Sequence, residues 1–243
     1  MIKVSLVGTG AVSTQLLRVF EKTKLIKVVE VLASRGNFNE AIANDKPEIY
    51  IIAVSDDAIS EVAKKLKDTN KLVVHTSGSV HLDALPHEVR GGVFYPLQTF
   101  SKEREVNFEQ IPICIEAKQE RDEVLLKKLG SLISKQVFEI TSEQRKTIHL
   151  AAVFVNNFSN HMFQLASEIC SENEVSFDLL KPLIEETVAK LQYLSPLNAQ
   201  TGPAKRNDQQ TIERHLNHLD NKTHKMVYEV LTNSIKETYE KKL

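Results

Sequence analysis

A glycine-rich turn directly after a short apolar run is the feature that most restricts how this chain folds. The run is Ile2–Val7, and the turn reads Gly8-Thr9-Gly10-Ala11-Val12-Ser13. In a βαβ dinucleotide-binding motif, the first glycine permits the tight turn and the second lets the backbone approach a pyrophosphate. The third position must only be small, and Ser13 is small. The pattern therefore predicts that Gly8, Gly10, Ala11 and Val12 bind a dinucleotide; a purely structural turn is the alternative.

Short apolar runs alternate with helical patterns through the first half of the chain. The run "IYIIAV" (49–54) is apolar at successive positions, which is typical of a strand buried on both faces of a parallel sheet. This alternation predicts an α/β fold with a doubly wound, mostly parallel Rossmann sheet. Strands are expected at Ile2–Val7, Lys27–Ala33, Ile49–Val54, Leu72–Thr76, Gly92–Tyr95, Pro112–Glu116 and Gln136–Glu139, and helices at Ala11–Lys22, Asn39–Asn44, Asp57–Leu66 and Arg121–Ser134.

The strand patterns stop after Ile140, so we expect a dinucleotide-binding domain at 1–140 and an all-α C-terminal domain at 141–243. The first helix of the second domain is apolar on nearly every side, which predicts that it is buried. The expected helices are Ser142–Cys170 with Ser142 as N-cap, Phe177–Tyr193 with Asp178 as cap and Pro182 in the first turn, Gln209–Leu219 capped by Asp208, and Asn221–Glu240.

The end of the second strand indicates which dinucleotide is bound. An NAD site needs Asp or Glu there for the ribose 2′-hydroxyl, but this chain has Ser34 and Arg35. A guanidinium suits a phosphate, so the pair predicts NADP; a plain surface arginine is the alternative. The loops after the next two strands add Val54, Ser55, Asp56 and Ser77 as expected cofactor contacts. Asp56 or Asp57 is also a possible helix N-cap.

Three stretches carry a resemblance to a known family: "HTSGSVHLDAL" (75–85), "FYPLQTFS" (94–101) and "TGPAKRND" (201–208). With the glycine turn they resemble the bacterial DUF2520 family, which combines a Rossmann-like NADP-binding domain with a helical C-terminal domain. The layout is more distantly similar to pyrroline-5-carboxylate reductase, ketopantoate reductase, prephenate dehydrogenase and the β-hydroxyacid dehydrogenases. The resemblance implies hydride transfer between NADPH and a small molecule bound between the domains, and a homodimer formed through the helical domain.

Such a reaction needs a proton donor, and the long helix at 142–170 offers one. At 100° per residue His149, Asn156 and Asn160 fall within about 40° of one another, and Asn157 lies some 60–80° away. The β-hydroxyacid dehydrogenases place a lysine one turn before their asparagine, but Ala152 and Val153 stand there here. His149 is therefore our expected general acid, with Asn156 beside it; a structural histidine is the alternative.

Substrate contacts are expected from two further loops. Gln98 and Thr99, which follow a strand, and Lys205 and Arg206 are the expected contacts from these loops, and Asn160 is expected to contribute from the long helix. The substrate that they would contact is a small, anionic keto or imine compound. The alternatives are turn chemistry for the first pair and a solvated basic loop for Lys205 and Arg206. His75 is expected to stabilise a loop rather than carry protons.

Composition limits the possible partners. The chain has 243 residues, 31 basic and 32 acidic, so its net charge of −1 predicts neither nucleic-acid nor membrane binding. Cys114 and Cys170 have no metal-ligand spacing, which predicts reduced thiols and no metal, and Lys3 is followed by a strand rather than a signal peptide. We therefore expect a cytoplasmic NADP-dependent oxidoreductase. A non-catalytic NADP-binding sensor or scaffold is the second hypothesis, and a purely structural dimerising protein is the third.

Overall fold

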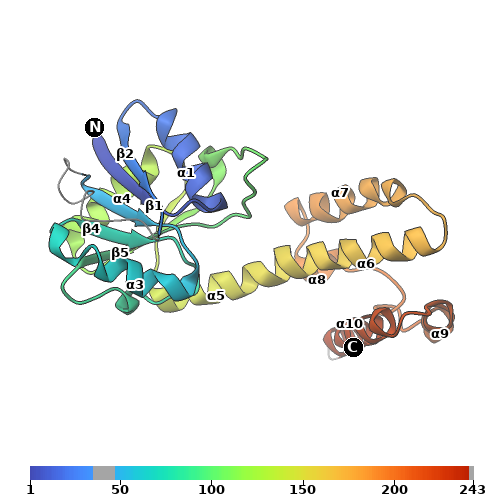
Figure 1. Ribbon diagram of the computed structural model, residues 1–243. Helices are drawn as coiled ribbons and strands as arrows, with labels where there is room; N and C mark the ends of the chain where they lie inside the picture. Colours follow the sequence, from blue (N-terminus) through green and yellow to red (C-terminus); the bar gives the residue numbers. More distant parts are fainter. Residues whose placement is uncertain (35–46, 241–243) are drawn as a thin grey trace. The chain divides into compact units, whose positions relative to one another are not determined.

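The computed structural model describes residues 1–34 and 47–240 and divides into two compact units, Met1–Asn157 and Phe158–Leu243. The first unit contains the sheet, and the second is helical (Figure 1). The strands end near residue 140, as the expected domain boundary assumes, whereas the division into compact units falls inside the helical run that follows. Within the described residues, no helix is long and apolar enough to cross a membrane.

Seven strands form one sheet in the order β2-β1-β3-β4-β5-β6-β7. All neighbouring pairs are parallel except β5 and β6, so the predicted mostly parallel, doubly wound Rossmann sheet is confirmed. All seven expected strands are present, β1 with the predicted bounds and the others with ends that differ by at most two residues. Their bounds are β1 (Ile2–Val7), β2 (Ile26–Leu32), β3 (Ile49–Ile52), β4 (Leu72–His75), β5 (Arg90–Pro96), β6 (Ile113–Ala117) and β7 (Val137–Glu139).

Helices cover both faces of the sheet. Because successive strand residues point to opposite sides, one strand contributes side chains to the core on each face. Ile51 of β3 is buried in a cluster with Phe20 and Leu126, which come from helices on one face. Its neighbour Ile52 is buried in a second cluster with Val62, from a helix on the other face. The helices concerned are α1 (Ala11–Glu21) and α4 (Glu120–Ser131) on the first face and α3 (Ile59–Lys64) on the second.

The helix expected at Asp57–Leu66 is shorter than predicted and is flanked by 3₁₀ turns. Neither Asp56 nor Asp57 caps it: the N-cap of the first turn is Ser55, and its side chain makes no capping bond. Asp56 instead accepts a hydrogen bond from Ser79. The helix expected at Asn39–Asn44 lies outside the described residues. The 3₁₀ segments of the first unit are η1 (Asp56–Ala58), η2 (Lys67–Thr69), η3 (Leu82–Ala84) and η4 (Phe108–Gln110).

The long helix predicted at Ser142–Cys170 differs from the structure in three respects. It consists of α5 (Ser142–Ala152), a π-helical segment η5 (Val153–Phe158) and α6 (Ser159–Glu172). Its N-cap is Thr141, which forms a capping box with Gln144, and not Ser142. The hydroxyl of Ser142 is instead bonded to Glu116 of β6. The expected burial is also wrong, since Leu150 and Phe154 are 61 % exposed and Val155 is 75 % exposed.

Beyond α6 the chain forms several short helical segments and a final helix of 19 residues, α10. Ser176 rather than Asp178 caps the first of them, because its hydroxyl reaches the amide of residue 178. Pro182 lies in the first turn of the next helix and Asp208 caps α9, both as predicted. Between the helices expected at Phe177–Tyr193 and Gln209–Leu219, the chain contains an additional turn of helix, α8. The bounds are η6 (Phe177–Leu180), α7 (Lys181–Ala189), η7 (Lys190–Gln192), α8 (Pro196–Ala199), α9 (Gln209–His218) and α10 (Lys222–Glu240).

Candidate functional site

The loops that follow β1, β3 and β4 converge in the first unit, as expected for the carboxyl ends of parallel strands. They line a groove of about 840 Å³. Most of the predicted cofactor contacts are brought together there. The groove-lining members of that set are Gly8, Gly10, Ala11, Val12, Ser34, Val54, Ser55, Asp56 and Ser77. Arg35 lies outside the described residues, so its role stays a prediction.

The glycine turn has the geometry that a pyrophosphate needs. Gly8 has φ +123°, and a Cβ there would lie 2.1 Å from the carbonyl oxygen of Ala53, so this position requires glycine. A Cβ on Gly10 would meet no atom within 4 Å, which leaves open space beside the first turn of α1. Ser13 is only 2 % exposed, as the close approach of helix and strand demands. The turn therefore fits a dinucleotide phosphate at the positive end of α1.

Two polar loops shape the far side of the groove. The hydroxyl of Ser77 accepts hydrogen bonds from the backbone amides of Ser79 and Val80, at 3.1 and 3.0 Å, and so folds the loop after β4. Asp56 accepts from the Ser79 hydroxyl, which ties this loop to the one after β3. His75 is fully buried, and its Nδ1 accepts from the amide of Ser77 at 3.2 Å. Burial lowers the pKa of His75 to about 3, so it is a neutral loop support, as expected.

Sequence reasoning missed Lys65, which lines the groove at the same end as Ser34. Its Nζ lies 3.5 Å from the carbonyl oxygen of Ser34. The ammonium group therefore stands beside the end of β2, where the second ribose of a dinucleotide binds in this fold. Nothing in the local pattern distinguishes this lysine from Lys64, because the approach of α3 to β2 is a tertiary contact.

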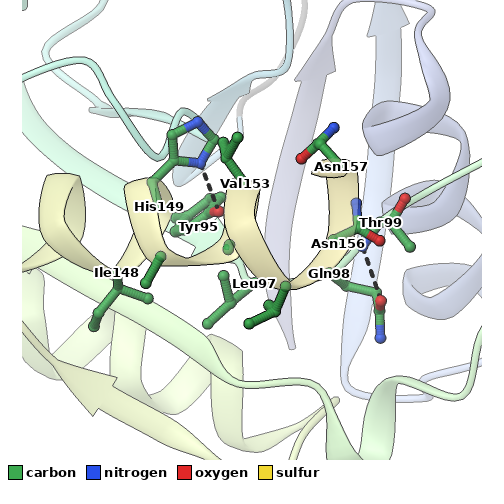
Figure 2. A pocket seen from close by; sticks show the side chains of 12 residues that line it. Tyr95, Leu97, Gln98, Thr99, Ile148, His149, Val153, Asn156 and Asn157 are labelled. Atoms are coloured by element: carbon green, nitrogen blue, oxygen red, sulfur yellow. Dashed lines mark hydrogen bonds between the residues drawn. The ribbon is translucent and has the colours of Figure 1, made fainter. Parts of the chain in front are cut away.

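A second cavity of about 390 Å³ adjoins the groove and shares part of its lining (Figure 2). Its apolar walls include Leu97 of the loop after β5 and Ile148 and Val153 of the long helix. The polar side chains common to the groove and the cavity are Tyr95, Gln98, Thr99, His149, Asn156 and Asn157. Of the predicted reaction-centre residues, His149, Asn156, Gln98 and Thr99 are thus brought together.

His149 has a partner that sequence reasoning did not identify. Its Nδ1 lies 3.1 Å from the hydroxyl oxygen of Tyr95, the penultimate residue of β5. The two rings pack edge to face with centroids 6.1 Å apart. Burial raises the pKa of Tyr95 to about 12, so the phenol keeps its proton at neutral pH. The motif "FYPLQTFS" contains this tyrosine, but nothing local indicates that it reaches a helix 54 residues later.

The π-helical segment explains why Asn157 also lines the cavity. A regular α-helix would turn Asn157 about 80° away from His149. From residue 153 the chain takes wider π turns, and Figure 2 shows Asn157 on the side of the helix that carries His149; Asn156 and Asn157 both line the cavity. π-Helical turns are rare and occur frequently at functional sites. Gln98 uses its side-chain oxygen locally, accepting from the amide of Thr99 at 2.8 Å, so its amide nitrogen is the end with donors to offer a ligand.

Residues 111–235 match the family described as "Domain of unknown function (DUF2520)". A candidate NADP oxidoreductase from Bacteroides fragilis is 36 % identical over 97 % of this chain and 98 % of its own, with a TM-score of 0.87. The chain belongs to the DUF2520 family.

More distant structures share the fold of this DUF2520 protein. A Thermotoga maritima protein is 23 % identical over 98 % of this chain and 99 % of its own, with a TM-score of 0.74. The Plasmodium falciparum pyrroline carboxylate reductase, solved with NADP bound, is 12 % identical over 98 % and 97 %, with a TM-score of 0.61. No protein of curated function matches the sequence.

The remaining predicted substrate contacts of the DUF2520 protein belong to its second unit. They are Asn160, Lys205 and Arg206. The Nζ of Lys205 donates to the carbonyl oxygen of Gln200 at 2.8 Å and lies 5.0 Å from the centre of the Tyr239 ring. This lysine is therefore held in a defined position within its own unit. The role of all three residues as substrate contacts stays a prediction.

Proposed function

We propose that this DUF2520 protein is an NADP-dependent oxidoreductase that transfers a hydride between NADPH and a small, anionic keto or imine substrate. The observation that carries the proposal is the continuity of the groove with the smaller cavity. A glycine turn suited to a pyrophosphate and a histidine suited to proton transfer line one connected space. The NADP oxidoreductase relative, similar along nearly the whole chain, supports the choice of cofactor.

The groove residues fit the cofactor in a specific order. Gly8, Gly10 and the first turn of α1 would hold the pyrophosphate through backbone amides and the helix dipole. Ser34 and Lys65, together with the predicted Arg35, would hold the 2′-phosphate that distinguishes NADP from NAD. The loops at Ser55 and Ser77 would hold the part of the dinucleotide nearer the cavity. When bound, the cofactor supplies the hydride.

The protein then has three tasks: to orient the substrate, to move a proton and to exclude water. We assign the proton to His149, which faces the cavity that adjoins the groove. Asn156, Asn157 and the amide nitrogen of Gln98 offer hydrogen bonds that orient a C=O or C=N group. The apolar wall of Leu97, Ile148 and Val153 keeps water from the reacting atoms. Asn160, Lys205 and Arg206 are proposed to contact the anionic end of the substrate.

A variant of Gly10 tests the cofactor site without disturbing the fold. A Cβ on Gly10 meets no atom within 4 Å, so the ligand-free melting temperature of Gly10→Val should fall only by the small cost of a poorer N-cap residue. NADPH at 100 times its Kd should stabilise the wild type by about 2.7 kcal/mol, or roughly 5–10 °C in melting temperature. We expect NADPH to give no rise in melting temperature in Gly10→Val. In Gly10→Ala, which adds a smaller side chain, the rise should be reduced but not abolished.

The same measurement compares cofactors and separates the two functional hypotheses. NADPH should raise the melting temperature more than NADH does at equal concentration. If neither cofactor raises it, the dinucleotide site is refuted. If NADPH binds but a panel of keto acids, imines and cyclic imines leaves its absorbance unchanged, the protein is the non-catalytic sensor of the second hypothesis.

We also propose that the protein forms a homodimer through its helical unit. Large apolar side chains are exposed on α7, beside it in sequence and on α10, with Leu183 at 61 % and Tyr193 at 88 %. An apolar surface of this kind on a water-exposed protein favours association, and a second copy presents a matching surface. The exposed set includes Leu179, Leu183, Val188, Tyr193, Met226 and Val230.

Sedimentation velocity tests the dimer. The wild type should sediment at twice the chain mass of 27.5 kDa, and Leu183→Glu should shift it toward the monomer, because a carboxylate would be buried in an apolar contact. Glu185→Lys changes a charge about 200° around the same helix and should leave the dimer intact. A wild-type protein that sediments as a monomer at micromolar concentration refutes the proposal.

A further inference from the structure

The ring of His149 has two close neighbours at its Nδ1 edge. Tyr95 Oη lies 3.1 Å from Nδ1. A Cβ on Gly78 would lie 2.5 Å from the same nitrogen and 2.8 Å from Cζ of Tyr95. Only glycine at position 78 lets both rings lie this close to the loop after β4. The pair is therefore already arranged before any ligand binds.

The direction of the Tyr95–His149 hydrogen bond follows from the partners available. Among the described residues, Nδ1 of His149 is the one hydrogen-bond partner of the Tyr95 hydroxyl. If Nδ1 carried the proton and donated, the phenol hydrogen would have no acceptor among the described residues, and a half-buried phenol usually keeps one. The phenol therefore donates to Nδ1, and the proton of the neutral imidazole resides on Nε2. Figure 2 shows this second ring nitrogen pointing away from Tyr95.

We infer that Tyr95 is a positioning residue that fixes His149 as the Nε2–H tautomer and replaces the proton that His149 gives away. The second half of this inference rests on the proposed function. As the Nε2–H bond breaks, an O–H or N–H bond forms on the reduced substrate, and the phenol proton of Tyr95 moves to Nδ1. The imidazole stays neutral throughout, and the phenolate then takes a proton from water.

The direction of this transfer is chemically reasonable. The alkoxide or amine anion left by hydride addition is a far stronger base than a phenolate, so the proton moves toward the substrate. Two nearby charges have opposite effects on the pKa of Tyr95. Asp56 raises it and so disfavours the phenolate, whereas Arg145 lowers it. Cys114, opposite Tyr95 on the neighbouring strand β6, keeps its thiol proton because burial raises its pKa to about 11. The phenol of Tyr95 is thus protonated before the reaction and is the group that can supply a proton to His149.

The tautomer is measured directly by ¹⁵N NMR of the histidine-labelled protein without cofactor. The chain has eight histidines, and the His149 signals are those absent from His149→Gln. We expect Nε2 to carry the proton above pH 8 in the wild type. Tyr95→Phe removes the donor and should give a mixture of both tautomers. A wild-type Nδ1–H tautomer, or an unchanged tautomer in Tyr95→Phe, overturns the inference.

Kinetics test the replacement of the proton. Tyr95→Phe should lower kcat by about 10- to 100-fold, as loss of a supporting hydrogen bond does elsewhere, with KM and the Kd of NADPH unchanged. Tyr228→Phe removes a hydroxyl that bonds Nδ1 of His215 at 2.8 Å in the second unit, so it is the matched control and should leave kcat unchanged. An equal kcat in Tyr95→Phe refutes the second half of the inference.

A second variant guards against a folding defect in Tyr95→Phe. Gly78→Ala keeps the phenol hydroxyl, but its Cβ would meet both the ring of His149 and Cζ of Tyr95, so it should push the two rings apart and also mix the tautomers. Because the NMR measurement uses no cofactor, it is independent of the proposed function. Absence of NADPH binding refutes that function alone, whereas a wrong tautomer in an active enzyme refutes the role of Tyr95 alone.

Discussion

Replacing His149 with glutamine is expected to lower kcat by about 10²- to 10⁴-fold, the usual contribution of a general acid. Glutamine keeps a side chain that hydrogen-bonds but has no proton to transfer at neutral pH. NADPH should still raise the melting temperature, because the glycine turn and α1 are unchanged. The measurement is the initial rate of NADPH oxidation at saturating substrate, with binding followed separately by thermal shift.

A second histidine supplies the control for His149→Gln. His87→Gln makes the same chemical change at an exposed histidine outside the groove and the cavity, and its kcat should equal that of the wild type. A His149→Gln enzyme that keeps more than half of the wild-type kcat would remove this residue as the proton donor. In that case Asn156 and Asn157 would orient the substrate, and water would supply the proton.

The dinucleotide end of the site was predictable because its determinants are local. The conformation of Gly8 and the open space at Gly10 follow from a strand, a turn and a helix within twenty residues. The strands of the sheet were equally readable, since runs such as Ile49–Ile52 are apolar at every position and are buried on both faces. In such segments local preference and tertiary packing agree.

The part of the site around His149 was only half predictable. It depends on a π-helical segment and on a long-range contact, and neither leaves a recognisable pattern in the sequence. His149 and Asn156 lie on the same helix, so the period of 3.6 residues predicted that they share a face. Asn157 was placed about 80° away by the same rule, and the π-helical turns from Val153 onward brought it to the cavity. Tyr95 reaches His149 across 54 residues of sequence. No periodicity reports a contact between the end of a strand and the middle of a helix.

Burial of the long helix was wrongly expected for a related reason. An apolar helix must cover its side chains, but the sequence does not say whether its own chain or another one does so. Phe154 and Val155 are exposed although the segment is apolar on most sides. The same ambiguity applies to α7, where Leu183 is exposed. The exposed apolar side chains of the helical unit, Leu183 among them, are the physical reason for proposing a second copy of the chain as its partner.

Replacing Arg145 with methionine is expected to destabilise the first unit by about 3–5 kcal/mol, the cost of breaking a buried ion pair from one side. Arg145 is fully buried and donates to Glu116 of β6, to the carbonyl oxygen of Val80 at 2.6 Å and to the hydroxyl of Ser142 at 3.1 Å. Methionine fills much of the space but leaves the carboxylate of Glu116 without its cation. Urea unfolding at neutral pH measures the change in the free energy of unfolding.

The interaction also anchors the helix that carries His149. Ser142 donates to Glu116 through its amide at 2.9 Å and its hydroxyl at 2.7 Å, so one carboxylate holds both Ser142 and Arg145 of the first turn of α5. His149 follows Arg145 by one turn of the same helix. We therefore expect Arg145→Met to lower kcat even at temperatures where the variant is folded, because the histidine is no longer held against Tyr95.

An exposed ion pair supplies the control for Arg145→Met. Lys127 and Glu139 are 2.7 Å apart with side chains 60 % and 51 % exposed, and Lys127→Met should cost less than about 1 kcal/mol. Adding Glu116→Gln to Arg145→Met should recover part of the lost stability, because the neutral amide leaves no uncompensated charge. If Arg145→Met is no more destabilising than Lys127→Met, the buried pair contributes nothing beyond a surface contact, and the position of His149 depends on Tyr95 and Gly78 alone.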